Sequence, residues 1–163
     1  MSATEQLLSR NENYAAAFDL AGLAAPPAMK VAIVTCMDAR LDPTRLLGLK
    51  PGDAHVIRNA GGVVTDDVIR SLSISQRELG TREIMLVHHT GCGLMTFTND
   101  EFAAARERDS GQRPEWSAGA FNDLEQDVRD SVRRVLECPF IPRKESVRGF
   151  VYEVETGLVR EVK

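Results

Sequence analysis

Hydrophobic residues fall into two kinds of segment along the chain, and their spacing predicts alternating strands and helices. Short continuous apolar runs, typical of strands buried on both faces, occupy 31–35 and 84–87. A third short strand is expected at 55–57. Apolar residues recurring every three or four positions predict helices over 66–79 and 121–135. This alternation indicates an α/β fold with a mostly parallel central sheet flanked by helices.

The two ends of the chain depart from this alternation. Residues 1–28 carry a loose apolar helical stripe and then a Pro-Pro pair that stops any helix, which predicts a helical arm and connector. The segments 150–154 and 158–162 flank a Glu-Thr-Gly turn, which predicts a hairpin. Because there is no internal repeat and no second-domain boundary, we expect one domain in which residues 29–163 form the core.

Composition narrows the functional classes. The chain has 163 residues, 43% of them hydrophobic, and a formal net charge of −4, so it can build one core but lacks the basic excess of a general nucleic-acid binder. No apolar run approaches the roughly 20 residues that span a bilayer. The N-terminus does not resemble a signal peptide, so we expect a cytoplasmic protein with no membrane or nucleic-acid partner. Three cysteines are too few for a disulfide scaffold and are candidates for packing, nucleophilic or metal-binding roles.

Two polar motifs follow the predicted buried strands, at 36–40 (Cys-Met-Asp-Ala-Arg) and 89–92 (His-Thr-Gly-Cys). Binding sites of α/β sheets gather beyond the carboxyl ends of the strands, and neighbouring strands lie only about 4.8 Å apart. The side chains of Cys36, His89 and Cys92 are therefore expected to converge. Two thiolates and one imidazole are ligands that suit zinc.

The fourth zinc position is left to water or to a nearby carboxylate. In an extended segment, alternate residues face the same way, so Cys36, Asp38 and Arg40 are expected to share one side. Arg40 would then hold Asp38 in a bidentate ion pair. A zinc ion left open in this way binds water and lowers its pKa towards about 7.

These motifs, with Arg-Asn-Ala-Gly at 58–61 between them, resemble those of the β-class carbonic anhydrases, in particular the small bacterial-type members. Order and spacing agree from about residue 31 to the C-terminus. The resemblance implies a zinc lyase, with one Zn²⁺ per subunit, that interconverts carbon dioxide and bicarbonate by means of zinc-bound hydroxide.

The resemblance also implies a role for each site residue. Cys36, His89 and Cys92 would bind zinc, and Asp38 with Arg40 would form the catalytic dyad. Asp38 would become the fourth metal ligand only in a closed state.

Further expectations concern the surroundings of the site. Gly61, the last residue of the 58–61 motif, and Gly93, which directly follows the 89–92 motif, are expected to contact the substrate, and the Val63-Val64 pair is a candidate apolar lining of the cleft. The family also implies a homodimer or higher homo-oligomer in which N-terminal helices embrace the partner. The apolar stripe of residues 7–18 is compatible with that embrace.

Two other functions remain open from the sequence. The first is hydrolysis of carbonyl sulfide or carbon disulfide on the same zinc site. The second is a non-catalytic structural zinc or redox-thiol module with Cys138 as the fourth ligand, although Cys138 on its own is more typical of a packing residue. His88 and His55 are expected to be structural.

Overall fold

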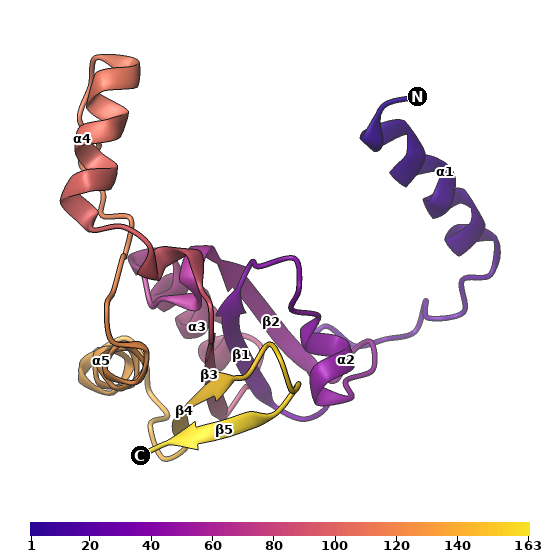
Figure 1. Cartoon of the computed structure of the whole chain (residues 1–163). Helices are drawn as coiled ribbons and strands as arrows, with labels where there is room; N and C mark the ends of the chain where they lie inside the picture. The colour runs from indigo at the N-terminus through magenta and orange to yellow at the C-terminus, as the bar shows by residue number, and fades with distance from the viewer.

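The sheet is the organising element of the protein. A computed structural model describes residues 1–163 and shows five strands in the order β2-β1-β3-β4-β5 (Figure 1). The first four pair in parallel and β5 is antiparallel to β4, so the predicted mostly parallel sheet and C-terminal hairpin are confirmed. The strands are β1 (Val31–Cys36), β2 (Ala54–Asn59), β3 (Glu83–His89), β4 (Val147–Tyr152) and β5 (Val159–Val162).

Five α-helices and two short 3₁₀ segments connect the strands. The helices are α1 (Ala3–Ala16), α2 (Pro43–Leu47), α3 (Asp66–Arg77), α4 (Asn99–Ser110) and α5 (Leu124–Glu137), and the 3₁₀ segments are η1 (Ala60–Gly62) and η2 (Gly93–Met95). The apolar faces of α3 and α5 meet alternate residues of β1 and β3. Together they bury the main core, which consists of Ala32, Val34, Val64, Val68, Leu72, Ile84, Leu86, Val135 and Ile141.

A second, smaller group of buried residues lies at the carboxyl ends of β1 and β3. We call it the site cluster, and it consists of Cys36, Leu41, Cys92 and Leu94. It is separate from the main core because it is built from the last residue of β1 and the segments that follow β1 and β3, not from the helices packed on the sheet.

Helix boundaries follow the capping residues. The side chain of Asp123 accepts a hydrogen bond from the backbone N–H of Gln126 and so starts α5. Phe121, which the apolar spacing placed inside this helix, therefore lies before it. Likewise α3 ends at Arg77, two residues before the predicted boundary.

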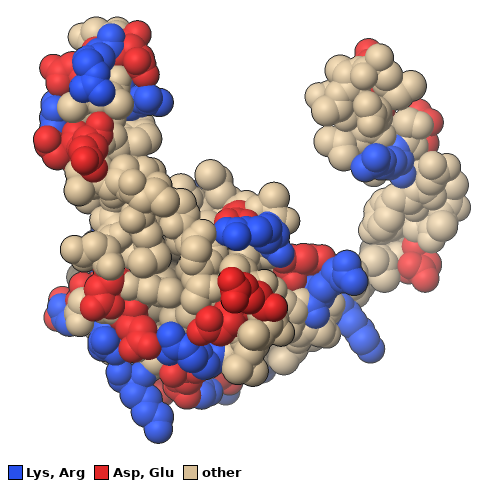
Figure 2. All heavy atoms as spheres, viewed as in Figure 1, with Lys and Arg blue, Asp and Glu red and all other residues tan.

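Two helices extend from the body of the molecule (Figure 1). Neither α1 nor α4 buries a residue. The predicted N-terminal helix is confirmed as α1, and it stands apart from the sheet at the end of an irregular connector. On α4, acidic and basic side chains are interspersed (Figure 2). No helix has the length and apolar character needed to cross a membrane.

Candidate metal centre

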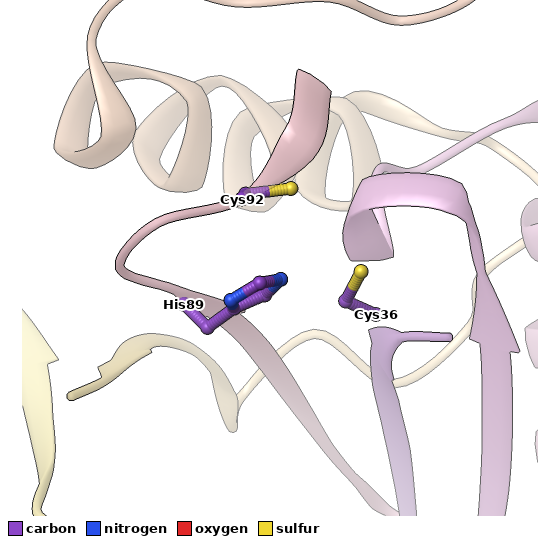
Figure 3. Close-up of side chains that lie close together, drawn as sticks. All are labelled: Cys36, His89 and Cys92. Carbon is purple, nitrogen blue, oxygen red and sulfur yellow. The ribbon is translucent and has the colours of Figure 1, made fainter. Parts of the chain in front are cut away.

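Three potential metal ligands meet at the carboxyl ends of two adjacent parallel strands. Cys36 is the last residue of β1, His89 is the last residue of β3, and Cys92 follows three positions later. All three are buried, and their ligand atoms lie within 4.8 Å of one another. Figure 3 shows the two sulfur atoms and the imidazole ring facing a common space. The structure therefore brings together the three residues that the sequence singled out.

Glycines shape the backbone around this group. Gly91 has a φ of +63°, which turns the chain after β3 so that Cys92 faces Cys36. Gly62 has a φ of +71°, and a Cβ there would lie 2.9 Å from the backbone nitrogen of Cys36. The close approach of η1 to the end of β1 thus requires a glycine at position 62.

The orientation of His89 suits it to bind a metal. Its Nδ1 lies 2.9 Å from the carbonyl oxygen of Thr90, to which it donates as N–H. The Nε2 atom then carries a lone pair, yet it is buried and has no hydrogen-bond partner. A buried unpaired nitrogen beside two cysteine sulfurs is the donor set that zinc prefers, with the other ring nitrogen fixed by a carbonyl.

The two thiols influence each other strongly. The hydrogen bond from the Cys92 thiol lowers the pKa of Cys36 to about 4, although burial opposes this shift. The same hydrogen bond, with burial, raises the pKa of Cys92. The pair therefore favours one thiolate by itself, and a divalent cation would stabilise the second.

Asp38 lies beside this group and is held by Arg40. Arg40 Nε donates to Asp38 Oδ1 at 3.0 Å and Nη2 donates to Oδ2 at 2.7 Å. Arg40 Nη2 also donates to the carbonyl of Gly91 at 3.0 Å, which ties the first motif to the second. Asp38 Oδ2 is 3.8 Å from His89 Nε2. The hydrogen bonds from Arg40 hold the pKa of Asp38 well below its usual range, so the carboxylate stays ionised next to the metal ligands.

The predicted extended conformation of this segment is wrong. Ladder pairing with β3 ends at Thr35, and the chain then turns, with the Leu41 backbone N–H donating to the Asp38 carbonyl at 3.0 Å. The Arg40 backbone N–H donates to Asp38 Oδ1 at 2.9 Å. The ion pair forms because this turn brings both the amide and the guanidinium of Arg40 back to the carboxylate.

A hollow of about 400 Å³ opens beside the group. Its walls are largely apolar, and both Gly61 and Gly93 line it, as does Asp38. The full lining is Cys36, Met37, Asp38, Ala60, Gly61, Cys92, Gly93, Leu94, Thr96 and Phe97.

Val63 and Val64 do not line this hollow, contrary to expectation. They border a neighbouring hollow of about 260 Å³ instead. Val64 is drawn into the main core, and the carbonyl of Val63 accepts a hydrogen bond from Asn59 Nδ2 at 2.8 Å. Val64 therefore faces the main core, whereas Val63 packs against the site cluster without lining the hollow.

The remaining cysteine and histidines lie elsewhere. Cys138 caps the C-terminus of α5 and packs against the main core, so it is not part of the ligand group. His88 is fully buried with Nδ1 3.1 Å from Asp127 Oδ2, and His55 Nδ1 lies 2.7 Å from Ser75 Oγ. A site closed by Cys138 is therefore not formed.

One residue of the site carried no individual expectation from the sequence. Arg58 donates hydrogen bonds to the carbonyls of Cys36, Asp38 and Leu41, at 3.0, 2.9 and 2.9 Å. An arginine in an ordinary strand-to-loop segment gives no sequence signal for such contacts, because the acceptors are backbone atoms brought near by folding.

The fold and the site together define a class of protein, an α/β protein with a Cys-His-Cys zinc-type group at the carboxyl edge of a parallel sheet. Residues 31–116 match the model of the family described as carbonic anhydrase. The chain is 55% identical over 162 residues to Beta-carbonic anhydrase 1 of Mycobacterium tuberculosis, with 99% of each chain covered. The protein belongs to the β-carbonic anhydrase family.

Two further relatives extend this comparison. A crystal structure of carbonic anhydrase from Streptococcus mutans superposes with a TM-score of 0.94 at 46% identity, covering 100% of this chain and 99% of that one. The Carbon disulfide hydrolase of Saccharolobus solfataricus is 36% identical to this chain, and the match covers 79% of this chain and 75% of that relative.

Proposed function

We propose that this protein catalyses the reversible hydration of carbon dioxide to bicarbonate and a proton. The observation that carries the proposal is the buried Cys36, His89 and Cys92 group, with an ionised Asp38 held beside it by Arg40. These three residues would hold one Zn²⁺ per chain. Zinc supplies a Lewis acid and lowers the pKa of water towards about 7.

Asp38 and Arg40 have different roles around the reacting water. Asp38 Oδ2, 3.8 Å from His89 Nε2, would accept a hydrogen bond from that water. Arg40 keeps the carboxylate ionised and donates to both of its oxygens, so it would hold Asp38 off the fourth ligand position of a bound zinc. If Arg40 releases it, the same carboxylate can occupy that position and close the site.

The hollow suits a small apolar substrate. Met37, Leu94 and Phe97 provide apolar walls, and Gly61 and Gly93 line the hollow beside the ligands. We assign Gly61 and Gly93 as substrate contacts on this basis.

The assignment of activity is tested by stopped-flow hydration of carbon dioxide with zinc-loaded protein and with Cys92→Ser. We expect rapid hydration by the first and only background hydration by the second. Equal rates for the two proteins would reject the proposal.

Carbon disulfide hydrolysis is the second candidate, because relatives with that name share 32–38% identity with this chain and the apolar hollow admits a linear sulfur compound. Release of hydrogen sulfide from carbon disulfide by the zinc-loaded protein separates the two. We expect kcat/KM for carbon dioxide to be the larger, and the reverse order would favour the hydrolase.

We further propose a cytoplasmic homodimer in which α1 covers a second copy of the chain. Leu7, Leu8, Tyr14 and Phe18 are 61%, 61%, 57% and 48% exposed on α1 and its C-terminal end, although all are apolar or aromatic. The three free cysteines suit a reducing compartment. Sedimentation of Leu7→Glu/Leu8→Glu against the unchanged chain tests the dimer. The variant is expected to shift to monomer, and an unchanged mass would exclude α1 from the interface.

A further inference from the structure

Arg58 links strand β2 to the segment that carries Asp38. It is the fifth residue of β2 and pairs in register with Thr35 of β1. Its Nε donates to the carbonyl of Cys36, and its Nη2 donates to the carbonyls of Asp38 and Leu41. One guanidinium therefore binds three carbonyls within six consecutive residues.

This segment has little other support. Between the end of β1 and the start of α2, the backbone contributes a hydrogen bond from the Met37 N–H to the Asn59 carbonyl and the turn between Asp38 and Leu41. The three carbonyl dipoles point at one place, and only a cation with several donors in a fixed plane satisfies them together. Hydrogen bonds to a charged group are also stronger than neutral ones.

Asp38 is consequently fixed from two sides. Its backbone carbonyl is held by Arg58, and its carboxylate is held by Arg40, which is itself anchored on the carbonyl of Gly91. With both attachments in place, Asp38 Oδ2 lies 3.8 Å from His89 Nε2. Arg58 does not line the hollow beside the ligands, so it acts on Asp38 only through the backbone.

We propose that Arg58 is a positioning residue that holds the 36–41 backbone so that the Asp38 carboxylate stays beside the metal ligands without occupying the fourth position. This inference rests on the proposed function. Loss of Arg58 lets the backbone of Asp38 shift while Cys36, His89 and Cys92 remain, so kcat falls more than KM rises. A misplacement of about 1 Å costs roughly 100-fold in rate.

The first test compares Arg58→Ala with Arg70→Ala, a matched loss of an exposed arginine that pairs with Asp67 on α3. With zinc content measured in each, we expect Arg58→Ala to keep one zinc per chain and lose about 100-fold in kcat, and Arg70→Ala to keep the full rate. Millimolar guanidinium is expected to restore part of the rate of Arg58→Ala in a saturable manner, and to leave Arg70→Ala unchanged. A full rate for zinc-loaded Arg58→Ala would overturn the proposal, as would a loss that guanidinium does not reverse.

A second readout needs no turnover. In cobalt(II)-substituted protein, thiocyanate binding at the fourth position is followed by visible absorption. We expect weaker thiocyanate binding in Arg58→Ala, because the released carboxylate competes for that position, and unchanged binding in Arg70→Ala. Equal affinity in the two variants would contradict the proposal. If the unchanged protein fails to hydrate carbon dioxide, the proposed function fails, while this titration still tests Arg58.

Should Arg58→Ala lose zinc or fail to fold, Arg58→Lys takes its place in both measurements. Lysine keeps the charge but cannot span three carbonyls as a planar fork. We expect full zinc content with reduced kcat and weakened thiocyanate binding. Zinc-loaded Arg58→Lys with unchanged kcat and thiocyanate affinity would overturn the proposal.

Discussion

The main core and the site cluster are both buried, but different forces hold them. The main core is built from aliphatic side chains of α3, α5, β1 and β3, and burial of apolar area stabilises it. In the site cluster, two of the four members are cysteines, and the backbone around them is fixed by Arg40 and Arg58. Stability and chemistry are therefore carried by separate residues, and substitutions in the two regions should have separable effects.

The largest expected effect is on metal binding in the site cluster. Cys36→Ser removes one of three ligands, so zinc content and hydration should both fall to background. Because a ligand that binds only the folded state raises its stability, added zinc should raise the Tm of the unchanged protein and leave that of the variant unchanged. Elemental analysis and thermal unfolding check this. Retention of stoichiometric zinc by the variant would exclude Cys36 as a ligand.

The next effect separates chemistry from metal binding. Asp38→Asn keeps the size of the side chain but removes the charged oxygen that accepts the hydrogen bond from the reacting water, so kcat should fall by roughly 10²–10⁴-fold at full zinc content. Asp67→Asn, an exposed acid paired with Arg70 on α3, is the matched control and should keep the full rate. This is checked by stopped-flow measurement of carbon dioxide hydration, with the zinc content of each variant determined beforehand. Equal rates for the two variants would remove Asp38 from the reaction.

A substitution in the main core should lower the stability of the fold and leave catalysis unchanged. Leu72 is fully buried, and Leu72→Ala should lower the free energy of unfolding by about 2–5 kcal/mol while leaving kcat per folded molecule unchanged. Leu136→Ala, at a position 39% exposed on α5, should have a much smaller effect. Denaturant unfolding measured alongside zinc content checks both. A loss of zinc from folded Leu72→Ala would show that the two regions are coupled.

The smallest effect is expected at the third cysteine. Cys138 lies outside the ligand group, so Cys138→Ser should keep full zinc and full activity, with a change in unfolding free energy of about 1 kcal/mol or less. Zinc analysis is the measurement that matters here. Loss of zinc from Cys138→Ser would instead support a site closed by four protein ligands, with Cys138 as the fourth.

The sequence predicted the regular parts of the fold because they follow local rules. The apolar runs located β1 and β3, and the polar motifs that follow those strands located Cys36, His89 and Cys92. Their convergence was predictable because adjacent parallel strands end at the same edge of a sheet.

The irregular parts depend on contacts that no local pattern encodes. The turn after Cys36 arises from hydrogen bonds of Asp38 and Arg40, and the alternation expected for a strand does not apply there. Val64 turned to the main core because its place depends on packing. The contacts of Arg58 could not be predicted from the sequence, because its acceptors are backbone carbonyls of another segment.

The most direct test of a zinc-dependent carbonic anhydrase site is a metal titration followed by stopped-flow carbon dioxide hydration. Metal-free protein is loaded with increasing zinc, and the rate is measured at each step between about pH 6.5 and 9, around the pKa of activated water. The rate should rise in proportion to zinc and level off at one zinc per chain. Full zinc occupancy without hydration at any pH in this range would contradict the account.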